Sequence, residues 1–110
     1  MSFIIIYITH SSEENAQKIA DHLLQKKMVA CANIFPIKSM YWWNGNIENE
    51  NEYVSIVKTI PKMWEILQKE ITKIHPYEVP CIMKIEAEAN EEYEKWIFLM
   101  VNGEHHFVIT

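Results

Sequence analysis

Arginine is absent from this chain of 110 residues, whose ten basic side chains are all lysines and are outnumbered by fifteen carboxylates. Proteins that bind nucleic acids depend on a basic electrostatic field and on the bidentate and stacking contacts of arginine. Enzymes that clamp phosphate or carboxylate groups also rely on the guanidinium fork. The missing arginine and the net charge of -5 therefore argue against a nucleic-acid partner and against phosphate-clamping catalysis.

Glycine and cysteine are scarce as well, with two of each. Two glycines cannot build the loops that cradle nucleotides, and no GxSxG or HExxH motif is present. Cys31 and Cys81 are too widely separated for a CxxC redox or zinc motif, and one pair makes no disulfide framework. We therefore expect a protein that is not an enzyme, with both cysteines serving as small core residues.

The sequence also lacks a long apolar run. The longest, Phe3 to Ile8, is far shorter than the roughly 20 residues that cross a bilayer, and no N-terminal segment resembles a secretory signal. We therefore expect a soluble, cytoplasmic protein without a membrane contact. Its length suits one domain, residues 1–110, and a hydrophobic content of 49% can supply one core.

The most informative feature that is present is the aromatic segment Tyr41-Trp42-Trp43, followed by Asn44-Gly45. Asn-Gly favours a two-residue hairpin turn, because both residues tolerate positive φ. The flanking segments are rich in β-branched and aromatic residues, so each predicted arm of about twelve residues extends roughly 40 Å. A compact domain of this size has a diameter of only about 35 Å. The aromatic tip therefore extends beyond its own globule, which predicts that another copy of the chain covers it.

Hydrophobic periodicity predicts the elements before and after this hairpin. The run 3–8 is apolar on both faces, as in a central strand. Ser11 and Glu14 have capping-box spacing and precede an amphipathic helix whose apolar face includes Leu24. Pro61 starts a second amphipathic helix, in which Ile66 belongs to the apolar face.

The C-terminal third predicts a connector, a strand and a helix. The segment 75–80 contains two prolines and ends the second helix, and residues 81–87 alternate like a strand. Asn90 caps a third helix that Asn102-Gly103 ends, and residues 107–109 have the composition of a short final strand. The order predicts an α+β, ferredoxin-like βαββαβ sandwich with an extra C-terminal helix. Many unrelated functions share this fold, so the fold alone decides no activity.

Four segments now point to a family. They are Ala30-Cys31-Ala32-Asn33-Ile34 with Pro36, the tryptophan hairpin 41–45, Lys58-Thr59, and His75-Pro76-Tyr77-Glu78-Val79-Pro80. Together they resemble the CutA divalent-cation-tolerance family over residues 3–101, and the hairpin combined with the last segment is more specific than either alone. The resemblance implies a ferredoxin-like protomer in a tight homotrimer, in which hairpins and sheet edges of neighbours pair around a threefold axis. It also implies a link to tolerance of copper and other divalent cations, with no established catalysed reaction.

The resemblance also carries a prediction about metal ligands. In the members that bind copper, the proposed ligands are a cysteine on the first strand and two adjacent histidines before Pro-Tyr, and the corresponding positions here are Ile8, Ile74 and His75. One imidazole does not make a tight transition-metal site. We therefore expect at most weak binding of copper or another divalent cation, with His75 and Cys31 as candidate ligands. The alternatives are a helix C-terminal histidine that bonds the following loop and a cysteine that serves packing.

Two further expectations come from the resemblance. The stretch 36–41 is one residue shorter than in most members, which implies the loss of a β-bulge and a local change of register. Lys58, Tyr77 and Glu78 should approach one another near clefts between subunits, where they would hold a small anion or metabolite. An interfacial Lys–Glu pair beside a tyrosine explains the same residues without any ligand.

Three functional hypotheses follow. The leading one is a homotrimer without catalysis that is associated with divalent-cation tolerance, with Tyr41, Trp42 and Trp43 in the subunit interface. The second is a trimeric small-ligand sensor with a cleft between subunits, similar to the nitrogen-regulatory trimers. The third is a plain scaffold that binds neither a metal nor a metabolite.

Overall fold

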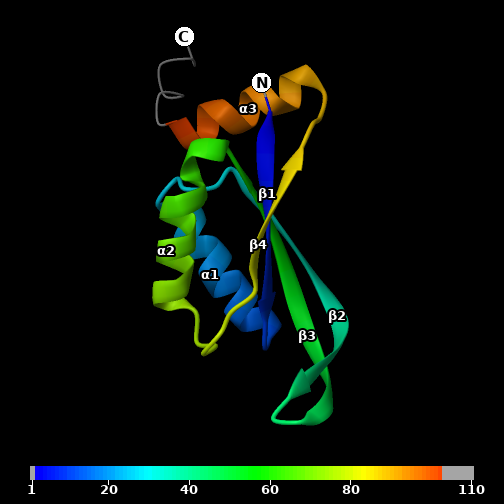
Figure 1. Cartoon of the computed structure of the whole chain (residues 1–110). Helices are drawn as coiled ribbons and strands as arrows, with labels where there is room; N and C mark the ends of the chain where they lie inside the picture. The colour runs from blue at the N-terminus through cyan, green and yellow to red at the C-terminus, as the bar shows by residue number, and fades with distance from the viewer. Residues whose placement is uncertain (1, 103–110) are drawn as a thin grey trace.

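The structure, a computed structural model, describes residues 2–102 (Figure 1). Its elements are β1 (Phe3–His10), α1 (Glu13–Gln25), β2 (Cys31–Trp43), β3 (Asn46–Thr59), a 3-10 turn (Pro61–Met63), α2 (Trp64–Ile74), β4 (Ile82–Ala87) and α3 (Glu91–Asn102). The four strands form one antiparallel sheet in the order β2-β3-β1-β4. This order confirms the predicted ferredoxin-like arrangement with an additional helix. The strand predicted at 107–109 lies outside the described residues, and no helix within 2–102 is long and apolar enough to cross a membrane.

Two apolar clusters hold the helices on the sheet. Helices α1 and α2 lie over the same face (Figure 1), because Ile19, Leu23 and Leu67 share one buried cluster with isoleucines of β1. Helix α3 crosses one end of the sheet, where Ile97 and Phe3 belong to a second cluster. Complete burial of one such side chain contributes about 1.5–3 kcal/mol relative to exposure. The base of the sheet is therefore stabilised by the chain itself.

Three local predictions about the helices were wrong. The hydroxyl of Ser12, not Ser11, accepts the capping hydrogen bond, from the backbone N–H of Asn15 at 3.0 Å. This places Asn15 at the third helical position, so the predicted capping box does not form. Leu24 and Ile66 are 38% and 53% exposed. Successive helical residues point about 100° apart. Leu24 and Ile66, which are each next in sequence to a buried leucine, therefore point away from the core.

The hairpin of β2 and β3 has the predicted turn. Asn44 and Gly45 have φ angles of 51° and 79°, both in the left-handed region that a two-residue turn requires. The register is unbroken along all of β2, from Cys31 opposite Lys58 to Trp43 opposite Asn46. No bulge interrupts the ribbon, so its residues alternate between the two faces without a phase change.

The hairpin also extends beyond the helices, as Figure 1 shows. The molecule measures 56 × 25 × 22 Å, and its radius of gyration is 15.2 Å. A compact chain of this length would have a radius of about 13 Å. At the tip, Met40, Trp42 and Ile47 are 68%, 72% and 59% exposed. The predicted mismatch between the ribbon and the globule is therefore present in the structure.

Candidate functional site

Alternation along the hairpin gives its two faces different chemistry. Ile6 and its partner Val57 face α1 and α2 and are fully buried. Because side chains alternate along a strand, the even-numbered residues of β3 lie on the opposite, outer face. Glu48, Glu50 and Glu52 therefore follow one another on the outer face of the tip.

The outer face of the tip and the segment after α2 form a groove with a volume of about 640 Å³. Four carboxylates and three aromatic rings dominate its lining. We call it the acidic groove, and its lining residues are Thr9, Ser11, Tyr41, Trp43, Glu48, Glu50, Glu52, Tyr77, Glu78, Val79 and Cys81. Its volume is within the range of small-molecule sites, about 300–1,000 Å³.

Two tyrosines donate hydrogen bonds to carboxylates of the groove. The phenol of Tyr41 donates to Glu50, and the phenol of Tyr77 donates to Glu52 Oε2 at 2.5 Å. Glu52 is only 8% exposed. Burial and the bond to Glu52 raise the pKa of Tyr77 far above its usual value, so the phenol keeps its proton at neutral pH. The aromatic side chains thus fix the positions of two acceptors.

Two stacked histidines lie directly behind this groove. The rings of His10 and His75 are 5.4 Å apart between centroids with an interplanar angle of 20°. His10 Nδ1 bonds Asn15 Oδ1 at 2.9 Å, and its Nε2 bonds the Ser55 hydroxyl at 2.7 Å. Because the amide oxygen only accepts, Nδ1 carries the proton and Ser55 donates to Nε2. Burial lowers the pKa of His10 below its usual value, which favours this neutral ring.

His75 is held in a complementary way. Its Nε2 donates to the Thr9 carbonyl at 2.8 Å, and its Nδ1 accepts from the backbone N–H of Tyr77 at 3.1 Å. Both nitrogens are therefore occupied, and the side chain is 7% exposed. This geometry is the predicted alternative, a residue at the helix C-terminus that bonds the following loop. In this conformation no lone pair is left for a metal ion.

A second polar cluster lies at the other end of the outer face. Lys58 Nζ donates to the Tyr93 hydroxyl at 3.1 Å and lies 5.3 Å from the centroid of that ring. Cys31 Sγ is 3.4 Å from the same hydroxyl. The bond to Tyr93 raises the pKa of Lys58, so this end of the face is cationic.

Within one chain, the predicted site residues therefore separate into two groups. Lys58 is six residues along β3 from Glu52, the partner of Tyr77, which corresponds to about 20 Å. Tyr77 and Glu78 share the acidic groove, and Lys58 is not in its lining. That the three residues meet across subunits stays a prediction.

The candidate metal ligands are also apart. His75 is tied to the carbonyl of Thr9, whereas Cys31 contacts Tyr93 under α3. Within the described range 2–102, no three His, Cys, Asp or Glu side chains are arranged to hold a metal ion. Cys31 is half-buried and Cys81 is exposed at the groove, so the prediction of a small core residue was wrong for Cys81. Burial of the sulfur nevertheless raises the pKa of the Cys81 thiol, with Glu52 adding to it.

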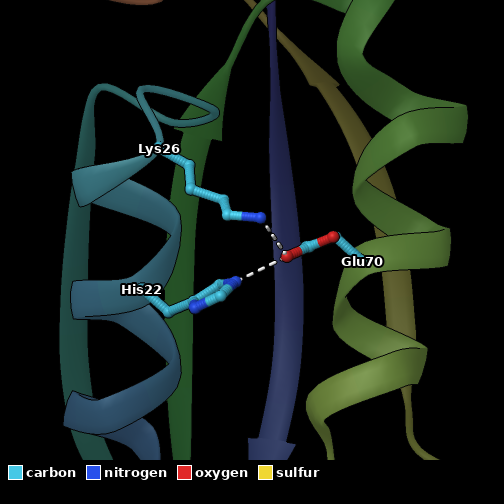
Figure 2. A network of polar contacts seen from close by, with 3 residues as sticks. All are labelled: His22, Lys26 and Glu70. Carbon is cyan, nitrogen blue, oxygen red and sulfur yellow. Dashed lines mark hydrogen bonds and ion pairs between the residues drawn. The ribbon is translucent and has the colours of Figure 1, made fainter.

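A third polar cluster joins the two helices away from the groove (Figure 2). Glu70 of α2 accepts from His22 Nε2 of α1 at 2.5 Å and from Nζ of Lys26, the residue that follows α1, at 3.1 Å. The hydrogen bond from His22 contributes most to lowering the pKa of Glu70, and the bond from Lys26 lowers it further. All three side chains bridge neighbouring helices, which indicates a role in packing.

Sequence reasoning missed the histidine pair and the row of glutamates. His10 and His75 are 65 residues apart, and nothing local in the sequence announces their stacking. The glutamates had a signal, because the segment 47–52 reads Ile-Glu-Asn-Glu-Asn-Glu. A carboxylate at every second position of a strand predicts one acidic face.

Known proteins resemble this chain along most of its sequence. A model of the family described as CutA1 divalent ion tolerance protein matches residues 4–99. The divalent-cation tolerance protein CutA of Pyrococcus horikoshii is 41% identical over 95 residues, which cover 86% of this chain and 93% of the relative.

Solved structures give the same result. One described as the periplasmic divalent cation tolerance protein CutA from Archaeoglobus fulgidus superposes with a TM-score of 0.87 at 44% identity, covering 90% of this chain and 98% of its own. CutA1 from Oryza sativa superposes with a TM-score of 0.87 at 28% identity, covering 91% and 94%. These names describe tolerance proteins and no enzyme. The chain belongs to the CutA1 divalent ion tolerance family.

Proposed function

We propose that the protein acts as a homotrimer in divalent-cation tolerance and catalyses no reaction. The observation that carries this proposal is the apolar tip on a chain of this family. Trp42 and its cross-strand neighbour Ile47 lie on one face of the ribbon, more than half exposed, and no element of the described chain reaches them. Large exposed apolar groups in soluble proteins mark interaction surfaces. A ring of identical copies covers such a tip without leaving open contacts.

The residues present do not fit a tight copper site. His75 uses both ring nitrogens inside the chain, Cys31 belongs to another cluster, and the remaining family positions are Ile8 and Ile74. We infer that any contact with copper or another divalent cation is weak. The contribution to tolerance then comes from the assembly and not from tight sequestration of the metal.

Sedimentation equilibrium tests the assembly. We expect a particle of three times the 13.1 kDa chain mass, and an unfolding midpoint that rises with protein concentration. A monomer at all concentrations would contradict the proposal.

Calorimetric titration with copper tests the metal contact. We expect binding weaker than micromolar, and no difference between the wild type and His75→Ala once both are shown to be folded. Micromolar binding that the His75→Ala substitution abolishes would show that the ring is released from Thr9 and Tyr77 to bind the metal.

A second candidate function, a small-ligand sensor, is favoured by the acidic groove. Its size and its fixed acceptors are those of a ligand site, and it lies where the protruding hairpin meets the segment after α2. A ligand there would contact both and so affect how the hairpin is presented to other copies. Sedimentation with and without a bound ligand separates this function from a plain scaffold.

We also propose a cytoplasmic location, on the sequence alone. The names of relatives differ on this point, since one structure is called periplasmic and the Arabidopsis thaliana relative chloroplastic. Fractionation of the source cells, with detection by antibody, tests this proposal.

A further inference from the structure

The strands β2 and β3 leave the body of the sheet at a definite point. The pairing of β1 with β3 ends at His10 opposite Tyr53, so the residues of β3 before Tyr53 pair with β2 alone. We call residues 37–52 the projecting ribbon. A hairpin of two strands is only marginally stable in water, because it needs a third strand or a helix to cover it. The direction of the projecting ribbon therefore depends on the contacts at its root.

Glu52 lies at this root, and Tyr77 holds it there. The phenol of Tyr77, in the segment after α2, donates to Glu52 Oε2 at 2.5 Å, and Glu52 is only 8% exposed. A hydrogen bond to a buried carboxylate is stronger than one between neutral groups, and its loss leaves a desolvated acceptor unpaired. Within residues 2–102, no other side-chain hydrogen bond joins the projecting ribbon to the rest of the chain. This contact thus ties the root of the ribbon to the segment after α2.

Tyr77 is itself anchored in the buried part of the molecule. Its backbone N–H donates to His75 Nδ1 at 3.1 Å, and the centroids of the two rings are 4.7 Å apart. His75 Nε2 donates to the Thr9 carbonyl of β1, and its ring stacks on the fully buried His10. The three rings form a continuous column from β1 to Glu52. The donor that meets Glu52 therefore has a fixed position relative to the sheet.

Proline restricts the remaining freedom of this segment. Pro76 directly precedes Tyr77, and its ring fixes its own φ near −65°. The residue before a proline is pushed out of the α region, and His75 accordingly has an extended backbone with ψ of 134°. The segment thus has few other conformations in which the phenol would miss its acceptor.

A small rotation at the root becomes a large displacement at the tip. From Glu52 to the turn at Asn44 and Gly45 the ribbon extends about 20 Å, so a rotation of about 10° at the root moves the tip by about 3–4 Å. The core of a subunit interface is packed as closely as a protein interior. A displacement of this size would separate Trp42 from the surface that covers it.

We propose that residues 75–77 act as a strap that fixes the direction of the projecting ribbon, with Tyr77 as a positioning residue for self-assembly. The apolar side chains of the tip make the interface, and the strap places them where a second copy can meet them. The strap lies within one chain and is complete without a partner. Its effect on assembly rests on the proposed homotrimer.

Tyr77→Phe tests the strap, because it removes the hydroxyl and keeps the ring. We expect the association constant from sedimentation equilibrium to fall about tenfold or more, as for the loss of one hydrogen bond to a charged group. Hydrogen exchange, compared at equal degrees of assembly, should be faster in residues 37–52 and unchanged in β1. Wild-type association in Tyr77→Phe, or faster exchange throughout the sheet, would overturn the proposal.

Tyr53→Phe is the matched control. Tyr53 follows Glu52 in β3 and points to the opposite face, and its hydroxyl has no hydrogen-bond partner within residues 2–102. This variant should associate and exchange as the wild type does. An equal loss in both variants would mean that the removal of any phenol near the root has this effect, which would refute the strap.

A double-mutant cycle with Glu52 separates the bond from general effects of either substitution. Glu52→Leu removes the acceptor and should weaken association as Tyr77→Phe does, and the double variant should be no weaker than either. Glu52→Gln keeps an amide oxygen that accepts from the phenol and should retain most of the association. Additive losses in the double variant would show that the two residues act independently, against the proposal.

The wild type distinguishes the failure of this proposal from that of the homotrimer. If the wild type is monomeric at all concentrations, the homotrimer fails and the role of the strap in assembly fails with it. If the wild type assembles and Tyr77→Phe assembles equally well, the homotrimer stands and the strap alone is refuted.

Discussion

The base and the tip of the β2–β3 hairpin are built from the same two strands and differ in what covers them. At the base, Val57 is fully buried beneath α1 and α2, and Lys58 contacts Tyr93 of α3 on the outer face. At the tip, Trp42 and Trp43 are 72% and 51% exposed on opposite faces. The pairing of β2 with β3 therefore continues without a break into the tip, where the buried core has already ended. The chain itself covers the base, whereas no element within residues 2–102 covers the apolar side chains at the tip.

The largest expected effect is on the base. Leu67→Ala removes a fully buried side chain from the main cluster and should lower the free energy of unfolding by about 2–5 kcal/mol. Ile66→Ala, one residue earlier on the same helix and 53% exposed, is the control and should cost much less. Urea unfolding measures both. Equal losses would mean that Ile66 is covered in the assembly and that the base too needs a partner.

The tip should respond in assembly and not in folding. Trp42→Ala should weaken self-association by about 2–4 kcal/mol, as expected for a central aromatic anchor of an interface. Asn49→Ala, an exposed polar residue opposite Met40 on the same face, should have a smaller effect. Sedimentation equilibrium gives both values. If Trp42→Ala assembles normally but unfolds more easily, the tip is stabilised within one chain and the comparison fails.

A fall in pH should destabilise the fold through His10, which is buried behind the acidic groove. Its pKa is lowered in the folded chain, so the unfolded chain binds the proton more readily. Stability is therefore complete above the unfolded pKa of about 6.5 and decreases as the pH falls toward the folded pKa. One proton changes the free energy of unfolding by at most about 1.4 kcal/mol per pH unit. His10→Gln should flatten this slope in urea unfolding below pH 6.5, and an unchanged slope would assign the acid sensitivity to other groups.

The smallest expected effect concerns the contact between α1 and α2 in Figure 2. The pKa of Glu70 is lowered by His22 and Lys26, so its contribution to stability is present above the unfolded pKa and is lost as the pH falls through the folded pKa. Glu70→Gln should slightly destabilise the protein at neutral pH and change nothing in strong acid. Glu65→Gln on the same helix is the control. A larger loss in acid than at neutral pH would contradict this assignment.

The fold was predictable because its signals are local. Alternation, helical periodicity and the Asn44-Gly45 turn each depend on residues close in sequence, and together they gave the order of elements. The wrong predictions about the helices concern positions where either of two neighbouring residues could have taken the same structural role. Ser12 caps α1 in place of Ser11, and Leu23, not Leu24, points into the core.

The candidate site was predictable only in part. The segment with Tyr77 and Glu78 does line the groove, but the position of Lys58 at the far end of β3 depends on strand register. The stacking of His10 on His75 depends on how the loop after α2 returns to β1. Both are tertiary relations between distant residues, which composition and spacing do not specify.

The unbroken ladder of β2 and β3 restricts how the hairpin can vary in length during evolution. Excision of one facing pair, for example Lys38 with Asn51, would move every residue nearer the turn to the opposite face, so that Glu48 and Glu50 would exchange faces with Trp42 and Ile47. Excision of two successive pairs would restore both surfaces on a shorter arm. Natural variants that keep both faces should therefore differ by an even number of facing residue pairs, or carry a β-bulge that restores the alternation of side chains.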